Sequence, residues 1–319
     1  MAKILLFSDL HLRSESRDVC VQVLNGVRDT ARNLGITQVG FTGDFFHVRY
    51  SIPVDIVNVT HEWAKSLKEA DLDLIFLPGN HDQVNLEGRH ALEVFEADHI
   101  KVYTEPTEDE FGAWLPYRKD PEVVQQALDS FSSPVLFAHV PIRGAMMNNL
   151  LPDENGLPLE MFEKFDKVLT GHYHKRQVHG NVQYLGSPWQ TRGDEWGQEK
   201  GFTVYDSDTK EVEFVEKHYG PKFHRLKASE LSAYSADISP FDKVRILSDN
   251  QEELKKAGHD LANRGLTAFS LEFTGEVIQE QRIKADKQTT LSEYARLYVG
   301  DSDTDLDQDR LLREFEGLR

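Results

Sequence analysis

Short apolar runs of four to seven residues recur through about the first 205 residues and alternate with longer segments of helical periodicity. Runs of this length suit buried strands better than buried helices, which need about ten residues or more. We expect strands at residues 3–8, 38–42, 72–77, 134–138, 167–170 and 182–185. This alternation of strands and helices is typical of an α/β layered core.

The helices and the late strands of this region have clear signals. Residues 18–34 carry apolar side chains at helical spacing, and Gly35 follows where such a helix would end. Asp120 and Pro121 form a capping residue and a first-turn proline, which predicts a second helix. Residues 202–206 and 212–216 are expected to pair as a hairpin at a sheet edge.

The pattern changes after Lys222. Residues 243–247, 252–263 and 269–273 are expected to form a strand, a helix and a strand, which would make a small second domain. A polar stretch follows. Residues 290–293 then match a capping box, which predicts a short amphipathic helix near the end of the chain.

The chain carries a net charge of −18, and acidic residues exceed basic ones both before and after residue 225. A protein that holds nucleic acid on a wide basic face is usually basic. Tight DNA binding by this chain alone is therefore disfavoured, and a partner that supplies positive surface is expected.

The composition also bears on the compartment. Cys20 is the one cysteine, so no internal disulfide can form and a reducing cytosol is the simpler location. Its apolar neighbours predict a buried thiol. We expect no signal peptide, because the apolar run at the N-terminus is too short for a signal-peptide core. We also expect no membrane helix, because no apolar run approaches the roughly 18 residues that spanning requires.

Five clusters of Asp, His and Asn stand out, nearly all of them directly after an expected strand. They are Asp9–His11, Asp44–His47, Asn80–Asp82, His139 and His172–His174. Ligand sites collect at the carboxyl ends of strands in α/β sheets, so residues far apart in the sequence can meet there. Residues at i and i+2 near a strand end share a face, so both members of an Asp-x-His or His-x-His pair can point toward one ion.

These residue types suit a pair of metal ions. A carboxylate such as Asp44 can bridge two cations, and Asn80 adds a neutral oxygen. A mixed set of oxygen and imidazole ligands fits Mn²⁺, Fe or Zn²⁺ better than Ca²⁺. Glycines 43, 79 and 171 would let the backbone turn sharply. The alternative, that the histidines only pack or face solvent, suits others in the chain: His61, His90, His99, His179 and His218.

The order of these clusters resembles the motifs of the calcineurin-like metallophosphoesterase superfamily. The motifs are Asp-x-His, Gly-Asp-x-x-His, Gly-Asn-His-Asp, His and Gly-His-x-His. Within this superfamily, residues 43–47 and 184–188 resemble double-strand-break repair nucleases of the SbcD type, and the modest length resembles the recombination nuclease subunits of T-even-like phages. The resemblance implies a layered β-sandwich core flanked by helices over residues 1–225. It also implies a small α+β capping domain over 226–280 and a linker with a helical partner-binding tail over 281–319.

The resemblance also implies roles for the polar clusters. One metal would be held by Asp9, His11, Asp44 and His174, and the other by Asp44, Asn80, His139 and His172. His81 would stabilise or protonate the leaving oxygen, and His47 would position the phosphodiester. Asp82 would either orient a histidine or cap a loop.

The implied activity is Mn²⁺-dependent exo- and endonuclease cleavage of DNA ends by a two-metal-activated hydroxide, in a recombination and repair complex. Fe, Zn²⁺ or Mg²⁺ would be alternative metals. The implied partners are double-stranded DNA ends and single strands, and an SbcC-type ATPase bound through the tail. The resemblance also implies a second copy of the chain docked through residues 52–67 and 91–95; the alternative is that these helical segments pack onto the chain's own sheet. The implied location is a bacterial cytosol or the cytosol of an infected host cell.

Several alternatives remain open from the residues themselves. The same dimetal site could serve a small-molecule phosphodiesterase or phosphatase, which the acidic charge favours, or the fold could be a non-catalytic scaffold. The candidates for contacts with DNA are Arg13, Arg17, Arg49, Arg192, Trp189 and Trp196. Each arginine could equally be a solvated charge, and the tryptophans could pack internally.

Overall fold

The computed structural model describes residues 2–83, 90–234 and 238–275. The chain divides into a unit of residues 1–272 and a unit of residues 273–319, of which only 273–275 are described. The linker and helical tail expected at 281–319 therefore lie outside the described residues. The expected division at 225 and 280 stays a prediction.

A six-stranded sheet holds the N-terminus of the chain. Its order is β12 (Val212–Glu216), β11 (Gly201–Asp206), β1 (Lys3–Phe7), β2 (Gln38–Thr42), β3 (Asp73–Leu77) and β4 (Ile100–Val102). Strands β1 to β4 run parallel, whereas β11 is antiparallel to β1 and forms the expected hairpin with β12. The parallel pairing brings the carboxyl ends of β1, β2 and β3 to one edge.

A second six-stranded sheet faces the first. Its order is β5 (Thr107–Glu108), β6 (Ala113–Leu115), β7 (Val135–His139), β8 (Lys167–Gly171), β10 (Val182–Tyr184) and β9 (Gln177–His179). Strands β6, β7, β8 and β10 are parallel, with the edge strands β5 and β9 antiparallel.

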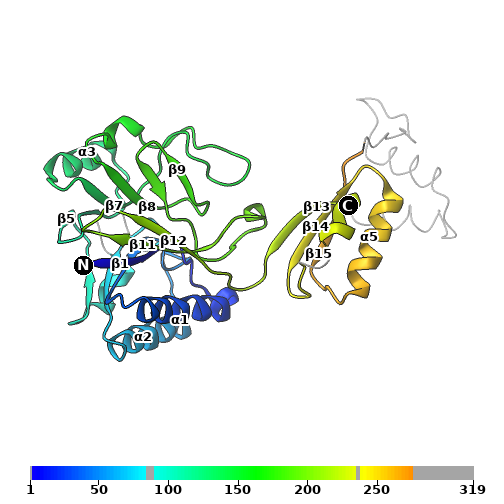
Figure 1. Cartoon of the computed structure of the whole chain (residues 1–319), viewed down its shortest axis with the longest axis horizontal. Helices are drawn as coiled ribbons and strands as arrows, with labels where there is room; N and C mark the ends of the chain where they lie inside the picture. The colour runs from blue at the N-terminus through cyan, green and yellow to red at the C-terminus, as the bar shows by residue number, and fades with distance from the viewer. Residues whose placement is uncertain (1, 84–89, 235–237, 276–319) are drawn as a thin grey trace, which may run out of the picture. The chain divides into compact units, whose positions relative to one another are not determined.

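Helices cover the outer faces of both sheets (Figure 1). Helices α1 (Arg17–Asn33) and α2 (Val54–Lys68) lie against the first sheet, and α3 (Pro121–Ser130) lies against the second. The short helical turns are η1 (Ser14–Ser16), η2 (Ala91–Phe95), η3 (Leu159–Phe162), η4 (Gly193–Glu195), η5 (Ala228–Glu230) and α4 (Leu231–Tyr234). No helix among the described residues is long and apolar enough to cross a membrane.

The alternation of side chains along β1 shows how the layers are filled. Leu5 and Phe7 pack toward the helices, whereas Ile4 and Leu6 pack between the sheets together with residues of β6, β7 and β8. All four side chains are buried because both faces of a parallel strand are covered. The predicted fold, a β-sandwich core flanked by helices, is therefore confirmed.

A third, three-stranded sheet has the order β13 (Phe223–Lys227), β14 (Lys243–Ser248) and β15 (Phe269–Phe273). Helix α5 (Gln251–Asn263) is capped by Asn250, whose side chain accepts hydrogen bonds from two backbone N–H groups. The strand–helix–strand unit expected here is confirmed. Strand β13 was not predicted.

The loops after β2 and β3 are held together by one buried carboxylate. Asp82 accepts backbone hydrogen bonds from Gly79 (2.9 Å), Asp44 (2.8 Å), Phe45 (3.0 Å) and Phe46 (3.0 Å). Of the two roles considered for Asp82, the structure shows the loop cap. No hydrogen bond joins it to a histidine among the described residues.

Of the three glycines expected to allow sharp turns, Gly43 does so, whereas Gly79 and Gly171 have ordinary φ values and lie close to neighbouring backbone. Gly43 has a φ of +100°, a conformation that disfavours other residues, so here the sharp turn is confirmed. Gly79 has an ordinary φ but lies so close to the next loop that a Cβ atom would be 2.3 Å from the backbone nitrogen of Asp44. It serves a close approach between two loops.

We expect Gly79→Ala to destabilise the fold by about 1–3 kcal/mol, because the added methyl group would push the two loops apart. For a domain of this size the melting temperature would fall by about 2–4 °C per kcal/mol, measurable by circular dichroism. The control is Gly258→Ala in α5, where the nearest atom to a Cβ is the end of Leu271 at 3.0 Å. Equal melting of Gly79→Ala and wild type would refute the close-approach argument.

Candidate metal centre

The seven expected metal ligands come together where strands of both sheets end. Those of the first sheet follow β1, β2 and β3, whereas those of the second end β7 or follow β8. They are Asp9, His11, Asp44, Asn80, His139, His172 and His174. The centre therefore draws donors from both layers of the sandwich.

A first group of donors lies around His11. The Nε2 atoms of His11 and His174 are 2.9 Å apart, and a carboxylate oxygen of Asp9 lies within 4.8 Å of ligand atoms of both. Asp44 Oδ2 is 3.8 Å from His11 Nε2. These four side chains make up one of the two expected ligand sets.

A second group lies around Asn80. Its Oδ1 atom is 3.1 Å from His139 Nε2 and 3.0 Å from His172 Nδ1, and those two nitrogens are 3.3 Å apart. Asp44 Oδ1 lies 3.4 Å from His139 Nε2. Asp44 thus directs one oxygen at each group, as a bridging carboxylate would.

Hydrogen bonds behind the rings fix which nitrogen faces the centre. His139 Nδ1 lies 2.8 Å from the Thr42 carbonyl oxygen, and His174 Nδ1 lies 2.9 Å from a carboxylate oxygen of Glu195. Carbonyl and carboxylate oxygens only accept, so in the neutral rings Nδ1 carries the proton and Nε2 is the nitrogen available to a metal ion. The donor set therefore fits two divalent ions of the Mn²⁺, Fe or Zn²⁺ type.

Burial and close charges shift the pKa values of these groups. Burial would raise the pKa of Asp44, but nearby histidines, His139 first, hold it well below its ordinary value. Burial would lower the pKa of His139, but the Asp44 carboxylate raises it to about 9. The pKa of His172 falls to about 3 through burial and the charge of His139, whereas burial and Asp44 raise that of Asp82 to about 7.

Backbone strain is concentrated in the same loops. Asp9 (φ +52°), His11 (+50°), Asp44 (+63°) and His172 (+103°) all lie in the left-handed region, which costs L-residues free energy. Backbone hydrogen bonds between the two loops hold them in place: Asp9 N–H donates to Gly43 O at 2.9 Å, and His11 N–H donates to Asp44 O at 3.0 Å. Strain that the surrounding structure over-determines is typical of functional sites.

His81 lines the cavity beside these groups, which has a volume of about 290 Å³. Its backbone N–H donates to Asp44 Oδ1 at 2.8 Å, and its Nδ1 lies 2.8 Å from the His47 carbonyl oxygen. His47 itself does not line this cavity. Its ring stacks on that of His81 at 5.9 Å, and its Nε2 is 2.9 Å from an Arg13 nitrogen.

The candidates for DNA contact are placed differently from one another. Arg192 lines the cavity, whereas Arg17 lines a groove between α1 and α2. Arg49 is exposed. Burial raises the pKa of the nearby Tyr117, and the charge of Arg49 partly offsets this shift. Trp189 is buried and donates to the Leu10 carbonyl oxygen at 3.0 Å, which is a packing role, and Trp196 is partly buried.

Three residues at the centre were missed from the sequence. The ring of Tyr117 stacks on that of His172 with centroids 6.3 Å apart. Glu195 and Lys200 are almost fully buried behind His174 and are bonded to each other at 2.7 Å. Burial would raise the pKa of Glu195, but the bond from His174 and the charge of Lys200 hold it well below its ordinary value.

Comparison with known proteins gives a consistent assignment. A model of the family described as calcineurin-like phosphoesterase matches residues 2–222. Exonuclease subunit 1 of Enterobacteria phage T4 is 24% identical in an alignment 328 positions long, which covers 95% of this chain and 95% of that one.

Two solved structures are also similar. The nuclease MPE of Pseudomonas putida is 17% identical, with a TM-score of 0.34, over 66% of this chain and 87% of that one. A dimetal phosphatase from Danio rerio is 11% identical, with a TM-score of 0.38, over 63% of this chain and 91% of that one. The family match, which covers most of the chain and every residue of the metal centre, shows that this protein belongs to the calcineurin-like phosphoesterases.

Proposed function

We propose that this protein is a Mn²⁺-dependent nuclease that cleaves DNA ends by exo- and endonucleolytic hydrolysis, within a recombination and double-strand-break repair complex. The observation that carries the proposal is the convergence of two donor groups on the shared carboxylate of Asp44. Bound there, two divalent ions would activate the attacking water and offset the charge that develops on the phosphate.

His81 is suited to act on the leaving oxygen. The His47 carbonyl oxygen accepts from Nδ1 at 2.8 Å, which leaves the Nε2 edge of the ring for the cavity. When Nε2 is also protonated it can donate to the leaving oxygen as the phosphodiester bond breaks. The role expected for His47, positioning the phosphodiester, stays a prediction, and its carbonyl oxygen and stacked ring would also hold His81 in place.

DNA is the favoured substrate for two reasons. The relative from phage T4 is named as an exonuclease subunit and aligns along nearly the whole chain. Arg192 adds a cation to the cavity where a phosphate backbone could be held. The net charge of −18 argues that a partner contributes much of the DNA-binding surface.

We expect His81→Ala to slow Mn²⁺-dependent degradation of a labelled linear duplex by about 10²–10⁴-fold, because proton transfer to the leaving oxygen would be lost. His259→Ala, an exposed histidine of α5, is the matched control and should retain wild-type activity. EDTA should abolish cleavage by all three proteins.

Two results would redirect the proposal. If wild type hydrolyses nucleotides or phosphomonoesters far faster than DNA, the small-molecule phosphodiesterase or phosphatase becomes the better assignment. Equal DNA cleavage by wild type and His81→Ala would remove His81 from the mechanism.

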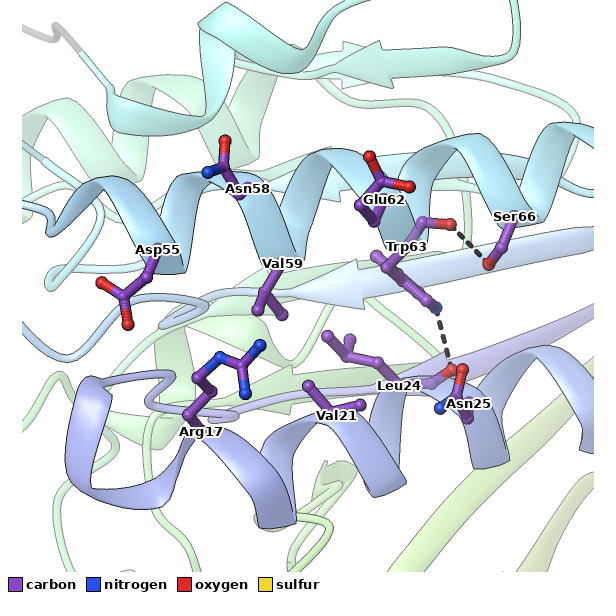
Figure 2. A pocket seen from close by; sticks show the side chains of 10 residues that line it. All are labelled: Arg17, Val21, Leu24, Asn25, Asp55, Asn58, Val59, Glu62, Trp63 and Ser66. Carbon is purple, nitrogen blue, oxygen red and sulfur yellow. Dashed lines mark hydrogen bonds between the residues drawn. The ribbon is translucent and has the colours of Figure 1, made fainter.

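A homodimer is the proposed assembly of the catalytic unit, through the expected face of α2. A groove of about 360 Å³ lies between α1 and α2, and its lining residues include Val21, Leu24, Val59 and Trp63 (Figure 2). Arg17 lies on one side of it and Asp55 and Glu62 on the other. Apolar surface flanked by opposite charges is self-complementary and suits a two-fold interface.

The exposed Val54 at the start of α2 provides a test of this assembly, since its side chain is 75% exposed and its replacement should not harm the fold. In sedimentation velocity at micromolar concentration we expect a wild-type dimer and a Val54→Glu monomer. Val178→Glu, at a position 69% exposed on β9, should stay dimeric. A monomeric wild type would exclude the dimer under these conditions.

The tail at 281–319 is the proposed binding segment for an ATPase subunit of the SbcC type. The word subunit in the name of the phage relative supports a multi-subunit enzyme. Removal of residues 281–319 should abolish co-purification with such an ATPase while metal-dependent hydrolysis of a small phosphodiester persists. Retained co-purification would place the interface elsewhere. A cytosolic location, bacterial or within an infected cell, is part of the same proposal.

A further inference from the structure

The loop from Ser187 to Lys200 contains a buried ion pair directly behind a candidate metal ligand. Glu195 and Lys200 are each 2% exposed, and Glu195 Oε2 lies 2.7 Å from Lys200 Nζ. Removing two charges from water is costly unless they are paired and fully hydrogen-bonded. A pair in this position therefore needs a reason beyond packing.

The hydrogen bonds of Glu195 point to that reason. Its Oε1 atom lies 2.9 Å from His174 Nδ1 and accepts from the Thr191 hydroxyl, whose oxygen is also 2.9 Å from that nitrogen. Its Oε2 accepts from the Thr191 backbone N–H at 3.1 Å and lies 3.3 Å from the Ser187 hydroxyl oxygen. With Lys200 these contacts satisfy both oxygens, so the carboxylate has one orientation. An ionised carboxylate accepts only, which makes His174 Nδ1 the donor.

Lys200 holds the other side of the same histidine. Its Nζ lies 2.9 Å from the His174 carbonyl oxygen and 2.7 Å from the Ser187 hydroxyl oxygen. Ser187 N–H also donates to the His174 carbonyl oxygen at 3.1 Å. The backbone and ring of His174 are thus fixed by one loop, and the Arg192 that lines the cavity belongs to that loop.

We propose that Glu195 is the positioning residue of the metal centre: it holds His174 as the Nδ1–H tautomer, so that Nε2 is free to bind metal, and Lys200 keeps Glu195 in place. This inference rests on the metal-binding role proposed for His174. It follows the general rule that partners of a ligating histidine set its tautomer and raise its affinity for the ion.

The decisive variant replaces both charges together, as Glu195→Gln with Lys200→Met. Glu195→Gln alone would leave Lys200 buried without a counter-charge and could unfold the loop. In the double variant, the glutamine amide can donate to His174 Nδ1 and favour the opposite tautomer, which would block Nε2. Asp242→Asn is the control, because Asp242 also pairs with a histidine, His224 at 2.9 Å, in the third sheet.

The readout is Mn²⁺ binding, followed by the EPR signal of the free ion. We expect wild type and Asp242→Asn to bind two ions. The double variant should bind one ion with unchanged affinity and the other about 10- to 100-fold more weakly. If wild type and the double variant bind both ions equally well, the role of Glu195 is refuted. If wild type binds no Mn²⁺, the proposed function fails as well, which separates the two cases.

A second measurement does not depend on the double variant. Long-range ¹H–¹⁵N correlation spectra of wild type with diamagnetic Zn²⁺ report which ring nitrogen of each histidine is protonated. The signals of His174, assigned by their loss in His174→Gln, should show a protonated Nδ1. A protonated Nε2 would overturn the inference, whatever the variants do.

Discussion

The candidate metal centre depends on four backbone N–H groups that donate hydrogen bonds to the Asp82 carboxylate. Those groups belong to the loops after β2 and β3, and no strand ladder could satisfy them there. A buried N–H without a partner costs about 1–3 kcal/mol, so one side chain removes several such costs together. The same contact sets the distance between Asp44 and Asn80, which come from different loops and serve the same donor group.

Because the cap draws the loops together, other features become necessary. Gly79 must lack a side chain at the point of closest approach, and Asp44 adopts a left-handed backbone conformation in the loop that Asp82 caps. Neither feature would be stable in an isolated loop. The dense, doubly covered sheets beneath supply the free energy that keeps the loops strained.

Much of this arrangement could be predicted from the sequence. The six expected strands of the core match the structure to within one residue at each end, because each is a short apolar run bounded by polar residues. His139 was found because it directly follows such a run. The ligand set could be proposed because the carboxyl ends of parallel strands lie at the same edge of a sheet, whatever the loops between the strands contain.

Other features carry no local signal. Strands β5 and β9 have two and three residues, too few for any periodicity, and each forms at an edge of the second sheet by pairing with a strand of that sheet. Glu195 lies in a loop rich in Gly and charged residues, where a buried carboxylate cannot be distinguished from a solvated one by composition. Its role depends on Lys200 and His174, which fold against it from outside the turn.

The distribution of the ligands between the two sheets has a mechanical consequence. Each donor group takes side chains from both layers: Asp9 and His11 with His174 in one, and Asn80 with His139 and His172 in the other. An ion in either group would thus be a cross-link between the two layers, in addition to contacts such as that of His139 Nδ1 with the Thr42 carbonyl oxygen. Bound metals would therefore stabilise the folded sandwich, so that the stability of the fold as well as its chemistry would depend on metal availability.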